Sequence, residues 1–201
     1  MAAGTPLKLG ILLSGGGTTL QNLAEVIAAG ELPAVITCVI SSNATAYGLT
    51  RAAKLHLPAY VVSKKDHVDL ASFSQAVAEI LRKHEVDLVC MAGYLSLWPI
   101  PPDFTGRVMN IHPALIPKFC GKGMHGHHVH EAVLRAGEKV SGCTVHFADN
   151  LYDHGPIILQ RPCPVLPEDT PETLAARVFQ EECQAYPEAI RLFIAGKCSA
   201  K

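Results

Sequence analysis

Residues 7–19 read LKLGILLSGGGTT, a run of mostly apolar residues followed by a serine, three glycines and two threonines. A near-continuous apolar run is typical of a strand buried on both faces, and a helical pattern follows through Ala29. Backbone N–H groups at the start of such a helix can converge on an anion, and Thr18 and Thr19 add hydroxyl donors. The stretch therefore predicts a phosphate site, although glycine-rich turns also occur simply to pack a helix on a strand.

The pattern does not fit the common dinucleotide or ATP sites. The G-x-G-x-x-G fingerprint fails at its last position, where Leu20 stands. The next apolar run ends in Ser42 and Asn43, where a dinucleotide site would place an acid to hold a ribose. The pattern G-x-x-x-x-G-K-[ST] is absent as well. A monophosphate is therefore favoured over NAD or ATP.

Strand and helix patterns alternate along the next part of the chain. Apolar strand patterns cover 35–41, 59–62 and 87–91, and helical patterns cover 44–56 and 70–84. This alternation predicts an α/β fold with a doubly wound, mostly parallel sheet and right-handed crossovers. Because the chain has 201 residues and no repeat or linker, it is expected to form a single domain over 1–201.

Composition limits the class of partner. Hydrophobic residues make up 49% of the chain, charged residues 17%, and the net charge is −1. No basic stripe suggests nucleic acid, and no apolar run reaches the ~20 residues that cross a bilayer. The amino terminus lacks a signal-peptide pattern, so a soluble, cytoplasmic protein is expected. The seven cysteines are scattered without a C-x-x-C pair, and we interpret them mainly as small buried hydrophobes.

A second polar motif ends the apolar run VMNIHP at 108–113. A proline biases the preceding residue toward extended geometry, so Asn110 and His112 should face one side of a strand together. At the carboxyl end of a sheet strand, an amide donor beside an imidazole can carry out proton chemistry near pH 7. Taken alone, the motif favours a turn cap at Asn110 and a core histidine at 112 over a catalytic pair.

The remaining segments predict a loop, a hairpin and a helix. Residues 121–130 form a Gly- and His-rich loop, but a third metal ligand at a recognisable spacing is missing, so no metal is expected. Strand patterns over 140–147 and 156–160 predict a carboxyl-terminal β-hairpin with a long loop. In that loop Asp153 can turn toward His112 or form an Asx turn, and local sequence favours the turn. A capped helix is expected from Thr170 to Phe193.

Together these segments resemble the phosphoribosylglycinamide formyltransferase family, folate-dependent enzymes of purine synthesis. The resemblance covers about residues 9–196. Its markers are LSGGGTTLQ at 13–21, MAGY at 91–94, NIHPALIPK at 110–118, VHF at 145–147 and DHGPIILQ at 153–160. It implies a Rossmann-like formyltransferase fold, with a phosphate-binding half over about 7–100 and a folate-binding and catalytic half over about 101–196.

The family resemblance also implies roles for particular residues. Asn110, His112 and Asp153 would be the catalytic trio. Gly17, Thr18 and Thr19 would hold the phosphate of glycinamide ribonucleotide, and Glu182 its ribose or glycinamide end. The pocket for the co-substrate 10-formyltetrahydrofolate would be lined by two segments in addition to Asn110: Leu95, Ser96, Leu97, Trp98 and Asp149, Asn150, Leu151, Tyr152, Asp153. The protein would bind small molecules and no nucleic acid, membrane or metal. It would be a monomer or a homodimer.

The implied reaction is transfer of a formyl group to the amine of the ribonucleotide, giving formylglycinamide ribonucleotide and tetrahydrofolate in de novo purine (IMP) biosynthesis. Negative charge develops on the formyl oxygen, where the Asn110 amide and a protonated His112 can stabilise it, one such donor being worth ~2.7–4 kcal/mol. Asp153 beside His112 would favour the imidazolium by its charge. An ordered water could relay the proton from the amine to the departing folate nitrogen.

The chain departs from the family pattern on the folate side. The family commonly has Met-Arg-Ile-Leu where this chain has residues 95–98, so Ser96 replaces an arginine. A second arginine is missing from the region 63–73, where Leu70 is the nearest match. Two other functions remain open at this point: formyltetrahydrofolate deformylase, in which water replaces the amine, and a non-catalytic nucleotide-binding sensor of the same fold.

Overall fold

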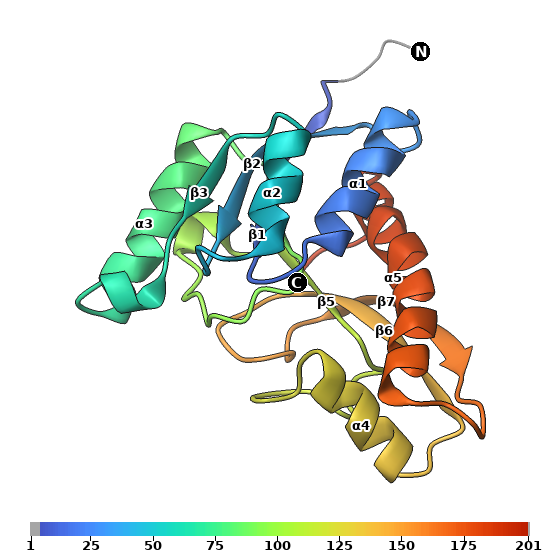
Figure 1. Cartoon of the computed structure of the whole chain (residues 1–201). Helices are drawn as coiled ribbons and strands as arrows, with labels where there is room; N and C mark the ends of the chain where they lie inside the picture. The colour runs from blue at the N-terminus through green and yellow to red at the C-terminus, as the bar shows by residue number, and fades with distance from the viewer. Residues whose placement is uncertain (1–4, 201) are drawn as a thin grey trace. The chain divides into compact units, whose positions relative to one another are not determined.

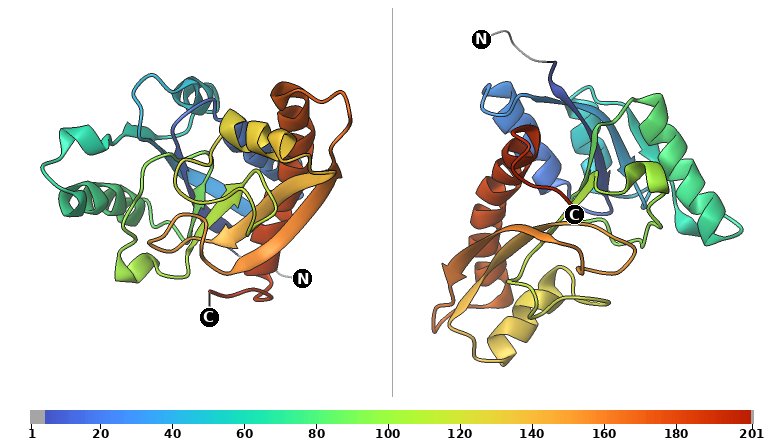
Figure 2. Two further views of the ribbon diagram at one scale, coloured as in Figure 1. Left: turned by 90° about the horizontal axis from the view of Figure 1, so that it is seen from below. Right: turned by 180° about the vertical axis from the view of Figure 1, so that it is seen from behind.

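The computed structural model describes residues 5–200, which divide into two compact units, the first running to Val108 and the second beginning at Met109. In the first unit, β1 (Leu7–Leu13), β2 (Ala34–Ser41), β3 (Ala59–Val61) and β4 (Leu88–Met91) form parallel pairs in the order β3-β2-β1-β4. Helices α1 (Thr18–Ala28) and α2 (Tyr47–Lys54) lie on one face of these strands, and α3 (Leu70–Lys83) lies on the other (Figures 1 and 2). Right-handed crossovers require this placement, since the chain steps outward from β1 to β3 and then returns to β4.

Burial explains the central strands of the first unit. Leu9 and the run from Ile11 to Leu13 are fully buried, as expected for a strand covered on both faces. Short 3₁₀ turns cover Lys64–Asp66 and Pro102–Phe104. Helix α3 begins where sequence predicts, because Asp69 accepts a hydrogen bond from the Ser72 backbone N–H at 2.7 Å and completes a capping box.

Helix α2 is shorter than the 44–56 span expected from sequence. The Asn43 carboxamide oxygen accepts hydrogen bonds from both the backbone N–H and the hydroxyl of Thr45, each at 3.0 Å. Such an Asx turn competes with helical hydrogen bonding, so the helix begins only at Tyr47. At the other end, His56 has a positive φ of 56°, which a continuing helix does not allow.

The described part of the second unit, residues 109–200, contains three strands and two helices. Its elements are β5 (Val108–His112, beginning at the last residue of the first unit), α4 (His127–Arg135), β6 (Val140–Phe147), β7 (Ile157–Pro164) and α5 (Pro171–Ile194). Strand β6 pairs antiparallel with both β5 and β7, and α5 packs on β6 and β7 (Figure 1). The Tyr186 hydroxyl on α5 donates to the Met109 carbonyl on β5 at 2.9 Å.

These elements confirm the predicted α/β class with a parallel sheet and a carboxyl-terminal hairpin and helix. Strand β7 extends beyond the expected end at Gln160 and includes Pro162 and Pro164. Those prolines are tolerated because, among the described residues, β7 pairs only with β6 and is an edge strand. Helix α5 begins as predicted, with Thr170 as its cap and Pro171 in its first turn. Within residues 5–200 no helix combines the length and apolarity that a bilayer span needs.

The cysteines match the sequence interpretation in part. None of the seven forms a disulfide, and four are buried, namely Cys38, Cys90, Cys143 and Cys163. Burial raises the pKa of the Cys38 and Cys143 thiols to about 12, which keeps both protonated at neutral pH.

Candidate active site

Asn110 and His112 lie two residues apart on β5 and both reach Asp153, as the alternation of side chains along a strand predicts. In the antiparallel register, Asn110 is opposite His146 on β6 and His112 is opposite Thr144. The His112 side chain is almost fully buried, whereas Asn110 is half-buried. Strand β5 therefore presents an amide and an imidazole to the same carboxylate.

Asp153 turns toward these two side chains from the β6–β7 loop. The Asn110 carboxamide Nδ2 donates to Asp153 Oδ1 at 3.2 Å, and His112 Nδ1 lies 3.5 Å from Oδ2. The Asx turn that local sequence favoured at Asp153 is made instead by Asp149, whose Oδ1 accepts from the Leu151 backbone N–H at 2.8 Å. Since Asp149 shapes the loop, the Asp153 carboxylate is free to face β5.

His146 is a fourth member of the cluster that the sequence analysis did not select. Its Nε2 lies 3.1 Å from Asn110 Nδ2 and 3.7 Å from Asp153 Oδ1. The ring Nδ1 donates to the Phe147 carbonyl at 2.9 Å, which leaves Nε2 to accept from Asn110. The signal in the sequence was a histidine within an otherwise buried strand, and finding its partner required the β5–β6 register.

Two backbone groups of the loop after β5 complete the cluster. His112 Nε2 donates to the Phe119 carbonyl at 2.7 Å, and the Gly121 N–H donates to Asp153 Oδ2 at 2.9 Å. Both residues have positive φ, 53° at Phe119 and 93° at Gly121. The donors on Asn110 and His112 are therefore satisfied within the protein.

A buried hydroxyl fixes the first part of the same loop. The Thr144 hydroxyl donates to the Ala114 carbonyl at 2.6 Å and accepts from the Ile116 N–H at 3.1 Å. The Gln160 carboxamide donates to both the Ile116 carbonyl and the Thr144 hydroxyl, each at 2.9 Å. These four bonds tie the segment after His112 to β6 and β7, so they help to set where the Phe119 carbonyl lies.

Burial and charge act in opposite directions on His112. Burial lowers the pKa of His112 below its ordinary value, and the Asp153 carboxylate offsets this only in part. Asp153 therefore raises the pKa of His112, as expected. The net shift of that pKa is nevertheless downward, because burial outweighs the carboxylate. Burial would raise the pKa of Asp153, but the neighbouring His146 and His112 rings and the hydrogen bond from the Gly121 N–H together lower it. The site thus pairs an imidazole that favours its neutral form with an ionised carboxylate.

Replacing Asp153 with asparagine is expected to lower the pKa of His112 further, because it removes the charge that raises it. Asparagine keeps an oxygen that can accept from the Gly121 N–H. An NMR titration of the His112 ring protons measures the shift. Asp149→Asn is the matched control, since Asp149 contacts His154, at 2.7 Å, in the same loop. An unchanged or higher His112 pKa in Asp153→Asn would show that the ring does not sense this carboxylate.

The glycine-rich turn of the first unit leads directly into α1. Gly17 has φ 72°, and a Cβ there would lie 2.6 Å from the Gly48 Cα, so only glycine fits. Thr18 follows as the first residue of α1 and is exposed, whereas Thr19 is buried. The start of α1 therefore offers one exposed hydroxyl beside its free backbone N–H groups.

The predicted folate-lining segment 95–98 divides into exposed and buried parts. The Leu95 N–H donates to the Ser14 hydroxyl at 2.9 Å, which brings this segment next to the glycine-rich turn. Leu95 is exposed, and Ser96 and Leu97 are partly exposed. Trp98 is 1% exposed and its indole N–H donates to the Ser74 carbonyl at 3.2 Å. Its side chain is a core residue and is not available to line a pocket, because an indole that fills the core also finds its one polar partner there.

Other predicted binding residues lie in the second unit. In the β6–β7 loop, Asn150, Leu151 and Tyr152 are exposed. Glu182 lies on α5, and burial raises the pKa of its carboxyl to about 7. Ordinary glutamate carboxyls titrate near 4.5, so this side chain is held in a poorly solvated position.

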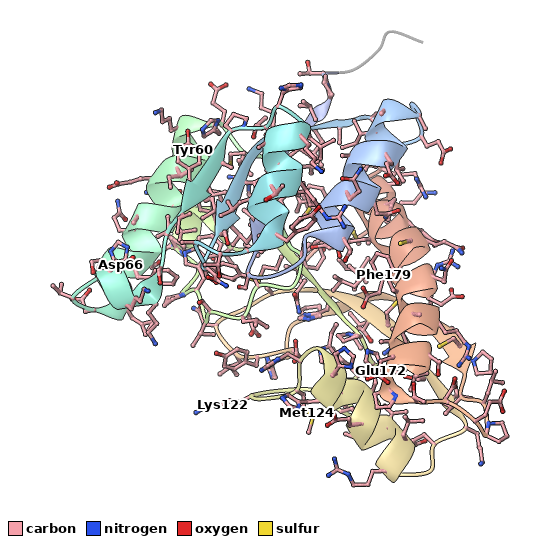
Figure 3. All side chains as sticks on the ribbon, viewed as in Figure 1. Tyr60, Asp66, Lys122, Met124, Glu172 and Phe179 are labelled. Carbon is pink, nitrogen blue, oxygen red and sulfur yellow. The ribbon has the colours of Figure 1, made fainter. Side chains whose placement is uncertain are left out.

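The Gly/His-rich loop leads into α4 with its histidines near carboxylates. His127 Nδ1 lies 3.7 Å from Glu172 at the start of α5, and His128 Nδ1 lies 3.6 Å from Glu131. Figure 3 labels Lys122 and Met124 in this loop and Glu172 at the start of α5. Within residues 5–200 no three histidine, cysteine or acidic side chains gather as metal ligands would.

Comparison with known proteins assigns the chain to a family. The family model described as formyl transferase matches residues 7–190. The chain belongs to the formyl transferase family. It is 37% identical over 198 residues to phosphoribosylglycinamide formyltransferase of Haemophilus influenzae, covering 96% of this chain and 90% of that protein. It is also 39% identical over 193 residues, or 94% of its length, to the trifunctional purine biosynthetic protein adenosine-3 of Drosophila pseudoobscura, of which it spans 14%.

A solved formyltransferase has the same fold. Glycinamide ribonucleotide transformylase 1 from Symbiobacterium toebii aligns with a TM-score of 0.88 and 42% identity, covering 96% of this chain and 90% of that one. The identity and coverage agree with the family resemblance found from the sequence motifs. They confirm the predicted formyltransferase fold and support a small-molecule reaction with a folate-derived co-substrate.

Proposed function

We propose that this formyltransferase moves a formyl group from 10-formyltetrahydrofolate to the amine of glycinamide ribonucleotide. The products are formylglycinamide ribonucleotide and tetrahydrofolate, in de novo purine biosynthesis. The observation that carries the proposal is the convergence of Asn110, His112 and Asp153 in a chain so similar to phosphoribosylglycinamide formyltransferase. An amide, an imidazole and a carboxylate supply the donors and the proton acceptor that formyl transfer needs.

The reaction follows from the groups on β5 and the β6–β7 loop. The amine nitrogen attacks the formyl carbon, and the electrons of the C=O bond move onto the oxygen. Asn110 Nδ2–H and His112 Nε2–H stabilise that oxyanion, exchanging their present acceptors, Asp153 and the Phe119 carbonyl, for it. A neutral imidazole can make this bond, which agrees with the lowered pKa of His112.

Proton transfer completes the step. The attacking amine loses a proton as its bond to the formyl carbon forms, and the folate nitrogen gains one as its bond breaks. Asp153 is ionised and accepts the proton through a water, then returns it to the leaving nitrogen. The low pKa of Asp153 makes it a weak base, so we assign it a relay role in which the proton is held only briefly.

We assign the binding residues on the same basis. Gly17, Thr18 and Thr19 hold the ribonucleotide phosphate, in keeping with a free helix amino terminus. Glu182 accepts hydrogen bonds from the ribose or the glycinamide end. The folate is held by the loop from Asp149 to Asp153 and by Leu95, Ser96 and Leu97, without the Trp98 side chain. The chain thus has a phosphate-binding part and a catalytic part.

A spectrophotometric assay of folate release tests the proposal. The protein is mixed with 10-formyl-5,8-dideazafolate, with and without glycinamide ribonucleotide. Release is expected only when the ribonucleotide is present, and it should collapse in Asn110→Ala, which removes an oxyanion donor. Release without the ribonucleotide would instead identify a deformylase. No release from folded wild-type protein under either condition would favour a nucleotide-binding sensor.

A further inference from the structure

A cavity in the second unit lies behind the loop that contacts His112. Its volume is about 320 Å³. Apolar walls come from Leu115, Pro117, Phe119, Val133 and Val140, and Ser141 also lines it. Cavities of about 150 Å³ with apolar walls accept benzene, so this one has room for a ring with substituents.

The Ser141 hydroxyl indicates where a ligand would bind. Ser141 is 3% exposed, and within the part of the chain that the structure describes its Oγ has no hydrogen-bond partner. A buried hydroxyl without a partner costs free energy, which a ligand group bonded to it would recover. The cavity therefore combines apolar walls with a buried hydroxyl that can bind a ligand, the usual composition of a small-molecule site.

The charged residues at this cavity favour a neutral ligand. Lys118 and Glu138 also line it, and their side chains pair with each other at 2.7 Å. Since the two charges balance, a charged ligand would have to break that pair or enter an apolar cavity without a counter-ion. Burying an unpaired charge is costly, whereas a hydroxyl needs only one partner.

The Phe119 residue links the cavity to the catalytic imidazole. Phe119 lines the cavity, and its backbone carbonyl accepts a hydrogen bond from His112 Nε2–H at 2.7 Å. A molecule packed against Phe119 would stabilise the loop in this arrangement. In the proposed reaction His112 must release that carbonyl to donate to the formyl oxygen, so an occupied cavity would oppose the step.

We propose that this cavity is a binding site for a neutral, ring-sized molecule with one hydroxyl group, and that its occupant inhibits the enzyme by holding the Phe119 carbonyl on His112. The binding part stands on the cavity and on Ser141. The inhibition part rests on the proposed function. A molecule of this class would bind apart from both substrates and would lower kcat without competing for either of them.

Titration of the full chain with benzyl alcohol, followed by amide NMR, tests the binding part. Saturable shifts are expected at Phe119, Val133 and Ser141. Ser141→Ala should weaken benzyl alcohol roughly 3- to 10-fold, the effect of one hydrogen bond. The affinity for toluene, which lacks the hydroxyl, should not fall. Val140→Phe, at a half-exposed position, should fill the cavity and abolish binding. Val35→Phe, at an exposed valine of β2, is the matched control.

The outcomes separate the two parts of the proposal. Three results would each overturn the site. The first is that the shifts fail to saturate, and the second is that benzyl alcohol still binds to Val140→Phe. The third is that Ser141→Ala prefers benzyl alcohol over toluene as strongly as the wild type does. Saturable binding with unchanged kcat would overturn the inhibition. If the wild-type protein forms no formylglycinamide ribonucleotide at all, the proposed function fails, and the NMR titration still decides whether the site exists.

Discussion

Replacing His112 with alanine is expected to lower kcat for formyl transfer by about 10²–10⁴-fold. The imidazole supplies a donor for the formyl oxygen through Nε2 and faces Asp153 through Nδ1, and alanine does neither. A water molecule cannot fully replace the imidazole. The folded protein holds the imidazole donor in position before the reaction, whereas a water would have to reorient as the charge develops. The loss should appear in kcat more than in KM, since the bond to the formyl oxygen strengthens only in the transition state.

Two measurements keep this result from being confused with unfolding. His112 is buried, so alanine leaves a cavity, and urea unfolding should be compared with that of wild type. His84→Ala is the matched histidine control, because the His84 ring lies outside the cluster and bonds to the Tyr60 hydroxyl at 2.8 Å. If a folded His112→Ala protein keeps wild-type kcat, the imidazole has no part in catalysis.

The sequence predicted those site residues whose side chains follow a local rule. The alternation of β5 placed Asn110 and His112 on one side, and Gly17 marked a turn that needs positive φ. His146 escaped because its role depends on which residue lies opposite Asn110, and register is not a property of one strand.

The rest of the site depends on backbone and packing, which a sequence pattern does not encode. The Phe119 carbonyl and the Gly121 N–H are backbone groups, which nearly every residue has. They contact His112 and Asp153 because of the conformation of the loop. The family resemblance assigned Trp98 to the folate pocket together with Leu95, Ser96 and Leu97, yet its ring packs against Phe104 in the core, with ring centroids 5.9 Å apart. The net pKa shift of His112 was misjudged for the same reason, since burial is a property of the folded chain.

Glu182→Gln is expected to stabilise the free protein at pH 8 by about 3 kcal/mol. Burial raises the pKa of Glu182 to about 7 from 4.5, so above pH 7 the folded state holds an ionised carboxylate that the unfolded chain hydrates better. As pH falls from 7 toward 4.5, the native carboxyl takes up a proton first and the cost disappears. Glutamine has no charge to bury at any pH. Urea unfolding at pH 8 and pH 5 should show a gain for the variant that falls to about a quarter of its pH 8 value at pH 5.

The same substitution should weaken use of glycinamide ribonucleotide, because the carboxylate that is costly in the free protein is the proposed acceptor for the ribose or glycinamide donors. A higher KM for the ribonucleotide together with higher stability at pH 8 would mean that the strain at Glu182 is kept for binding, as is common where function requires a buried charge. Glu168→Gln, at an exposed glutamate, controls for loss of charge alone. If the variant is no more stable than wild type at pH 8, the ionised Glu182 carboxylate is well solvated in the folded protein. Glu182 would then carry no cost in stability that substrate binding has to explain.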